Sequence, residues 1–235
     1  MKKRNNTSRI ELLDAIRGLA VVLMVLHHLL YDLYYFCNAP YWIFSNPVLD
    51  ALHYFFAGLF ILISGISSNF SRSNVKRGLK TLALALCVTL ATWAIDNPAW
   101  FGILHCLGCC MVLYGLTRKF WDRLPDWFFP AVLPVTIAVT ACLANGVTVP
   151  FRGFFWLGFC SEGFSSSDYF PLLPWLAVFL LGTWVGKYIK AGKLPDWFYR
   201  TKAPRLAAVG RLSLWIFIAH QPVLFGLIRL IQLIF

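Results

Sequence analysis

The sequence predicts an all-α membrane protein, a polytopic bundle of about seven transmembrane helices with its N-terminus in the cytoplasm. Of the 235 residues, 59% are hydrophobic and 13% are charged, and the mean hydropathy is +0.68. The core of one soluble domain could not bury that much apolar surface. In addition, Lys and Arg residues gather in alternate short loops, as they do in multi-pass membrane proteins.

The first predicted helix is the one most clearly marked for function. Residues 9–35 are apolar enough to cross a bilayer, yet they include Glu11, Asp14, Arg17, His27, His28 and Asp32. An ionisable group at the centre of a bilayer costs at least ~2.5 kcal/mol, so six of them in one such stretch indicate a working helix. Ser8 followed by Glu11 is a capping-box pattern that predicts its start. No small-residue cleavage site follows, so we expect this helix to be retained.

Six further apolar stretches follow in the chain, separated by polar or basic loops. Two prolines in the fifth stretch, Pro130 and Pro134, are acceptable because neighbouring helices can satisfy the freed backbone groups. Residues 147–168 are rich in Gly, Ser and Phe and predict a loop, and residues 189–211 predict a basic loop. We expect one transmembrane domain over residues 1–235, with spans at about 12–36, 48–68, 81–95, 99–116, 127–144, 169–188 and 212 to the C-terminus.

The distribution of positive charge predicts the orientation. Eighteen of the 21 Lys and Arg residues lie in the N-terminal segment and the second, fourth and sixth loops, and only Arg152 lies in a loop on the other face. By the positive-inside rule the N-terminus is cytoplasmic and the C-terminus extracytoplasmic, in the cell membrane. The same placement indicates that the net charge of +11 comes from loops next to the lipid bilayer. We therefore expect the bilayer, and no nucleic acid, as a partner.

Three histidines from different spans are predicted to reach one level near the outer surface, namely His28, His53 and His105. Asp32 follows His28 by four residues, so the two share a helix face. A carboxylate there would fix the imidazole tautomer and make His28 a better base, as in any acid–base pair. For a single histidine, a packing or interfacial role stays open. His220 lies deeper, and the sequence assigns it no role.

The cysteines give weaker signals. Cys37 and Cys160 fall in loops on the same predicted side, so a disulfide between them is left open. A C-x-x-C spacing within Cys106, Cys109 and Cys110 is compatible with a metal, but these residues lie in an apolar run without a second pair. We interpret them as packing residues, like Gly182-x-x-x-Gly186, and expect neither a metal nor a haem.

Several motifs in a fixed order resemble the catalytic-domain family of heparan-α-glucosaminide N-acetyltransferase, and the resemblance is closest to its short bacterial members. The chain also resembles, more distantly, the membrane acyltransferases that O-acetylate bacterial polysaccharides, where L-D-x-x-R-G precedes an essential histidine; His28 is the matching position. The motifs are R-I-x-L-L-D-A-I-R-G-L-A-V-x-L-M-V-L-H-H, L-I-S-G-I-S, F-G-I-L-H-C-L-G, D-Y-F-P-L-L-P-W-L-A-V-F-L-L-G and L-S-L-W-I-F-I-A-H-Q-P.

The resemblance implies transfer of an acyl group, usually acetyl, from cytoplasmic acetyl-CoA to a hydroxyl or amine of an extracytoplasmic sugar or glycan. His28 would then act as general base on the acceptor with Asp32 orienting it, and His53 and His105 would line the acceptor pocket. Asp168 and Tyr169 would bind the acceptor at the outer mouth of the sixth span. The human-type enzyme has an additional luminal domain with no counterpart here, which argues against a heparan-type acceptor. Basic residues at the inner ends of the first three helices would hold the CoA phosphates, namely Arg17, Arg72, Lys76, Arg77 and Lys80.

Two other functions remain open at this stage. A transporter or exporter could use His28 and Asp32 as a proton relay, although the internal repeats common in transporters are not evident. A b-type cytochrome could hold haem between two histidines. The sequence does not decide the acceptor, the acyl chain or the oligomeric state, and Asp14 is also a candidate partner for Arg17 at the i+3 position.

Overall fold

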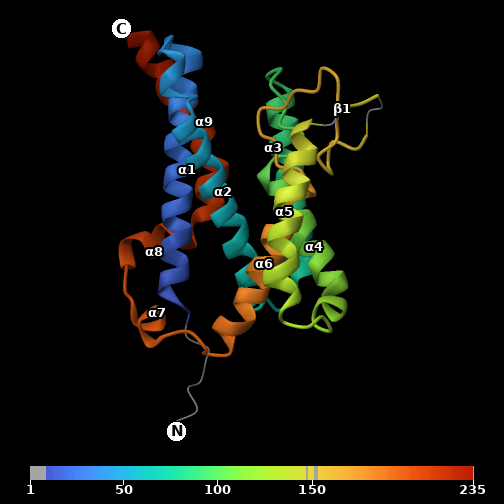
Figure 1. Cartoon of the computed structure of the whole chain (residues 1–235). Coiled ribbons are helices and arrows are strands. Elements are labelled where there is room, and N and C mark those ends of the chain that lie inside the picture. Colours follow the sequence, from blue (N-terminus) through green and yellow to red (C-terminus); the bar gives the residue numbers. More distant parts are fainter. Residues whose placement is uncertain (1–8, 147, 151–152, 235) are drawn as a thin grey trace. The chain divides into compact units, whose positions relative to one another are not determined.

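The computed structural model describes residues 9–146, 148–150 and 153–234. The chain divides into two compact units, with Met1–Phe60 and Leu194–Phe235 in unit 1 and Ile61–Lys193 in unit 2. The expectation of one domain stays a prediction. The elements, coloured along the chain in Figure 1, are α1 (Glu11–Cys37), η1 (Tyr41–Ile43), α2 (Pro47–Ser68), α3 (Asn74–Trp93), α4 (Ile103–Trp121), α5 (Phe128–Gly146), β1 (Thr148–Val149), β2 (Cys160–Ser161), α6 (Leu172–Lys190), α7 (Asp196–Arg200), α8 (Pro204–Arg211) and α9 (Ser213–Ile234).

The prediction of an all-helical protein is confirmed, apart from one pair of two-residue strands in which β1 and β2 run parallel. A helix overlaps each of the seven predicted spans. Among the described residues, five candidates are long and apolar enough to cross a membrane, namely α1, Tyr41–Ser68, α4, α6 and α9. The apolar part of α5 is shorter, and α3 begins at Asn74 rather than near Thr81, so that it includes Lys76, Arg77 and Lys80. Seven spans and their orientation therefore stay predictions.

Helix α1 begins without the capping box that the sequence predicts. Its N-cap residue is Ile10, which makes no side-chain cap bond, and Ser8 lies outside the described residues. The Glu11 carboxylate instead accepts a hydrogen bond from the backbone N–H of Ala203 at 2.9 Å and lies 3.3 Å from Lys202 Nζ. Glu11 thus fixes the segment before α8 to the start of α1.

The prediction of a basic loop at residues 189–211 is wrong in that two short helices, α7 and α8, form there. In unit 1, α8 packs against the first half of α1 through Ala207 and Gly210, which are buried. A Cβ atom added at Gly18 would lie 2.1 Å from the carbonyl oxygen of Leu206, and one at Gly210 would lie 1.8 Å from that of Asp14. The two helices can approach this closely only because glycine stands at both positions.

We expect Gly210→Ala to destabilise unit 1, because the added methyl group would push α8 off α1. Overpacking of a tight contact typically costs ~1–3 kcal/mol. The measurement is the thermal unfolding midpoint of purified protein. Gly226→Ala on α9 is the matched control, since a Cβ there would meet nothing within 4 Å and alanine favours a helix. Equal midpoints for the two variants would contradict the close approach.

In unit 2, polar side chains stabilise the C-terminal end of α2. The Arg77 guanidinium donates to the Ser64 carbonyl at 3.1 Å, and Lys190 Nζ donates to the Asn69 carbonyl at 2.8 Å. Cations at a helix C-terminus satisfy its unpaired carbonyls and offset its dipole. The predicted packing role of the glycine pattern on α6 is confirmed, because a Cβ at Gly182 would lie 2.1 Å from the Leu62 carbonyl. Helix α5 also continues through Pro134.

Candidate active site

His28 lies on α1 with one ring nitrogen held by its own helix. Its Nδ1 is 3.0 Å from the Met24 carbonyl oxygen. A carbonyl oxygen can only accept a hydrogen bond, so Nδ1 carries the proton and Nε2 is the basic nitrogen of the neutral ring. The tautomer is therefore set by the backbone of Met24. The described hydrogen bonds do not join Asp32 to His28.

The ring that lies against His28 comes from α9. The centroids of His28 and His220 are 4.8 Å apart with an edge-on angle of 69°. His220 Nδ1 is 2.7 Å from the Phe217 carbonyl oxygen, so by the same argument its Nε2 is also an acceptor. His220 is 9% exposed, and its Nε2 is buried without a hydrogen-bond partner. The histidine to which the sequence assigned no role is thus the direct neighbour of the predicted base.

Asp32 is fully buried and joins α1 to α9. Its exposure is 0%, and its Oδ1 accepts a hydrogen bond from Gln221 Nε2 at 2.8 Å. Asp32 Oδ2 and Gln221 Oε1 are both buried without a partner. Because Gln221 directly follows His220, the Asp32–Gln221 bond positions the part of α9 that carries His220.

The atoms left without partners in this cluster share one property. Asp32 Oδ2, Gln221 Oε1 and the unprotonated His220 Nε2 are all hydrogen-bond acceptors. Buried polar atoms are nearly always paired, and an exception calls for water, an ion or a ligand. The three atoms would suit a group that donates hydrogen bonds, such as a hydroxyl, an amine or water.

The other histidines are arranged differently from the prediction. His53 stacks on His27, with centroids 4.2 Å apart, and His27 lies 6.2 Å from His28. His27 is therefore part of a second ring pair in unit 1, together with His53. His105 belongs to unit 2, where its ring stacks on Phe101 at 5.8 Å. Unit 1 thus brings together four of the five histidines.

Asp168 and Tyr169 are bound to backbone groups within unit 2. Asp168 Oδ2 accepts a hydrogen bond from the Ile103 N–H at 3.0 Å and so caps the start of α4. Tyr169 Oη donates to the Phe155 carbonyl at 2.6 Å. Burial raises the pKa of the Asp168 carboxyl to about 6, although the Ile103 hydrogen bond acts in the opposite direction. Both side chains order the segment between α5 and α6.

The raised pKa of Asp168 predicts a pH dependence of stability. In the unfolded chain this carboxyl has its ordinary pKa of 3.8, so the folded protein binds the proton more tightly, and stability falls as the pH rises from about 4 to 6. Asp168→Asn, which keeps the acceptor oxygen without the charge, should remove this slope and match or exceed the parental melting temperature at pH 7.5. Asp168→Ala should lose the cap as well, at a cost of ~0.5–2 kcal/mol. Identical slopes in parent and Asn variant would refute the assignment.

Two of the cations that were predicted to bind phosphate contact other groups of the protein instead. Arg17 donates to Asp14 Oδ1 at 2.9 Å, which confirms the i+3 pairing, and Asp14 also contacts Arg9. Asp14 is only 4% exposed, so it needs this positive charge beside it. Arg77 lies against Ser64 and Met111. The geometry therefore favours structural roles for Arg17 and Arg77.

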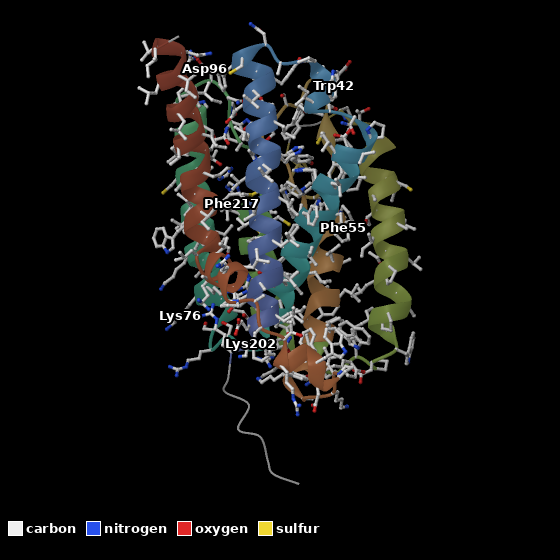
Figure 2. All side chains as sticks on the ribbon, turned by 90° about the vertical axis from the view of Figure 1, so that its left-hand side faces the viewer. Trp42, Phe55, Lys76, Asp96, Lys202 and Phe217 are labelled. Atoms are coloured by element: carbon white, nitrogen blue, oxygen red, sulfur yellow. The ribbon has the colours of Figure 1, made fainter. Side chains whose placement is uncertain are left out.

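The remaining three cations, Arg72, Lys76 and Lys80, are exposed around the first turns of α3. Figure 2 shows Lys76 at one end of this helix and Asp96 beyond its other end. Lys76 and Lys80 are four residues apart and so lie on one helix face. The described interactions give their side chains no carboxylate partner. They are available to bind an anion.

Comparison with known proteins decides the family. Residues 9–222 match the family described as heparan-alpha-glucosaminide N-acetyltransferase, catalytic. The chain belongs to this family. The match includes α1 and extends past His220 and Gln221, so it covers the residues that form the histidine cluster. No curated protein and no solved structure matches the chain.

The cluster includes two residues of α9 that helical periodicity alone does not single out. His220 and Gln221 lie in the last of the family-like motifs, I-A-H-Q-P, and that motif is the sequence signal that could have pointed to them. Cys37 and Cys160 are free thiols in different units. Cys106 and Cys110 are fully buried in α4. Within the described ranges, no group of three or more His, Cys, Asp or Glu residues is placed to hold a metal ion.

Proposed function

We propose that the chain is an integral membrane acyltransferase that moves an acetyl group from cytoplasmic acetyl-CoA to a hydroxyl or amine of an extracytoplasmic sugar or glycan. The family match supports acetyl transfer. The observation that carries the mechanism is the His28 ring, whose Nδ1 is held by Met24 and whose basic Nε2 is left for proton transfer beside His220. A positioned imidazole with a defined tautomer is the usual general base for this chemistry.

The reaction needs one base and no change of oxidation state. His28 Nε2 accepts the proton of the acceptor hydroxyl or amine as that oxygen or nitrogen attacks the thioester carbonyl. A bond forms between the acceptor atom and the acyl carbon, and the bond from that carbon to sulfur breaks. The CoA thiolate then takes up the proton from His28. The ring returns to its neutral form with Nδ1 still bound to Met24.

Asp32 and Gln221 support this chemistry from a second position. Their unpaired oxygens can accept hydrogen bonds from the acceptor while their mutual bond fixes His220 beside His28.

On the donor side we assign CoA phosphates to Arg72, Lys76 and Lys80, with Arg17 and Arg77 supporting the helices. His53 and His105 stay proposed acceptor contacts. Asp168 and Tyr169 also stay proposed acceptor contacts. A proton-relay transporter would need a His28–Asp32 contact, and the Asp32 bond goes to Gln221.

The proposal requires the residues before and after α4 to face opposite sides of the membrane. We expect a cysteine at Asn97, an exposed residue after α3, to react with an impermeant thiol reagent only from outside the cell. A cysteine at Lys119, exposed near the end of α4, should react only from the cytoplasm. Both would be introduced into a cysteine-free background. Labelling of both from one side would contradict the orientation that the loop charges predict.

The direct test of the activity is incubation of purified protein with labelled acetyl-CoA and a panel of amino sugars, neutral sugars and glycans. We expect label in at least one sugar and release of free CoA in equal amount. Absence of transfer to every acceptor, with acetyl-CoA binding intact, would count against the proposal. A Soret absorption band in the purified protein would favour the cytochrome alternative instead.

A further inference from the structure

The segment between α5 and α6 forms one wall of an open cavity that the histidine chemistry does not use. This cavity of about 450 Å³ lies in unit 2 and is lined by Trp100 and by some of the residues between Gly153 and Ser165. Its volume is within the ~300–1,000 Å³ range of small-molecule sites. The lining combines four aromatic rings with two serines and one carboxylate; the aromatic residues are Trp100, Phe155, Phe159 and Phe164 and the acid is Glu162.

The walls of the cavity are held in place by hydrogen bonds and ring contacts. Phe155 and Phe164 stack with centroids 5.5 Å apart, and Tyr169 Oη donates to the Phe155 carbonyl at 2.6 Å. The backbone N–H of Trp100 donates to Ser166 Oγ at 2.8 Å. This hydrogen bond joins the α3–α4 connection to the segment. Gly163 has a φ of +76°, a conformation that favours glycine, and turns the chain between Glu162 and Phe164. The site is therefore formed before any ligand arrives.

The chemistry of the lining limits what can bind. Aromatic faces can pack against the apolar C–H face of a saturated ring. A carboxylate accepts hydrogen bonds from hydroxyl or ammonium groups. Glu162 is exposed, and within the described part of the chain its carboxylate has no ion-pair or hydrogen-bond partner. An acyl chain would gain nothing from this charge. A pyranose ring presents both an apolar face and a rim of donors.

We propose that this aromatic cavity binds a pyranose ring of the sugar, with Phe164 and neighbouring rings against its C–H face and Glu162 accepting hydrogen bonds from its hydroxyl or amino groups. The inference rests on the proposed function in that the bound ring belongs to the acetyl acceptor. The cavity would add affinity for parts of the acceptor remote from the reacting atom. Such binding lowers KM without changing kcat.

The binding test uses the full chain in lipid nanodiscs, without glycoside detergents that would compete and without acetyl-CoA. Saturation-transfer NMR is recorded with glucose, glucosamine and octanol. We expect saturation of the sugar ring C–H protons in the parent. Phe164→Leu, which keeps an apolar side chain, should weaken sugar binding about two- to tenfold through the lost ring face. Glu162→Gln, at an exposed position with little risk to folding, should weaken glucosamine more than glucose.

Phe154→Leu is the matched control, because Phe154 lies in the same segment but does not line the cavity. It should bind sugars like the parent. Saturation of octanol but of neither sugar would assign the cavity to lipid and overturn the proposal, as would parental sugar binding in both cavity variants. If acetyl transfer occurs with the parental acceptor KM in Phe164→Leu, this inference fails alone. If sugars bind but no acetyl group moves, the proposed function fails alone.

Discussion

His28→Ala is expected to lower acetyl transfer by ~10²–10⁴-fold, the usual contribution of a positioned general base, while acetyl-CoA binding remains. The reason is that His28 Nε2 is the basic nitrogen left over once Nδ1 is bound to the Met24 carbonyl. The measurement is the initial rate with labelled acetyl-CoA at saturating acceptor, with donor binding followed separately by calorimetry.

His27→Ala is the control for this prediction, because His27 is the next residue on the same helix and stacks on His53 rather than on His220. It should retain most of the activity. If His27→Ala is inactive and His28→Ala transfers at the parental rate, the reacting group lies at the other ring pair. Full activity in both variants would refute general-base catalysis from α1.

The second large effect is expected at the Asp32–Gln221 bond. Gln221→Leu leaves a fully buried carboxyl without its hydrogen bond and releases the turn of α9 that places His220. We expect kcat to fall by about 10- to 100-fold, the scale of a misplaced catalytic group, with a loss of ~1–3 kcal/mol in stability. Asp32→Asn keeps an acceptor oxygen for Gln221 and should be affected less.

Gln232→Leu provides a control on the same helix, because Gln232 Nε2 also bonds α1, at the Phe36 carbonyl, but at an exposed position. It should leave kcat unchanged. A parental rate in Gln221→Leu together with a large loss in Asp32→Asn would mean that Asp32 acts on the substrate or on His28 directly. In that case the predicted His28–Asp32 pair would be restored.

The apolar helices were predictable from sequence because the bilayer imposes one requirement, about twenty apolar residues with internally paired backbone groups. Helix α8 was not predictable in this way. It is eight residues long and basic, and it is stabilised by close backbone approach at Gly18 and Gly210 rather than by large apolar side chains. A hydropathy profile does not detect a helix contact that depends on glycine rather than on apolar side chains.

The candidate site was predictable only in part. Helical spacing placed Asp32 on the face of His28, but spacing within one helix cannot say which residues of another helix meet that face. The structure places His220 and Gln221 there and ties the His28 tautomer to a backbone carbonyl. Likewise, their predicted position at the inner ends of the first three helices suggested Arg17 and Arg77 as phosphate ligands, whereas they contact Asp14 and the end of α2. The role of a charged side chain depends on the groups that it contacts, and those contacts are set by the tertiary structure.

Transfer across a sealed membrane tests the central claim most directly. Proteoliposomes with the N-terminus of the protein facing outward would be loaded with an acceptor sugar, and labelled acetyl-CoA would be added outside. The account predicts that acetylated sugar accumulates inside while CoA is released outside, and that His28→Ala proteoliposomes show neither. Labelled sugar that forms only when donor and acceptor are on the same side, or that forms equally with His28→Ala, would contradict it.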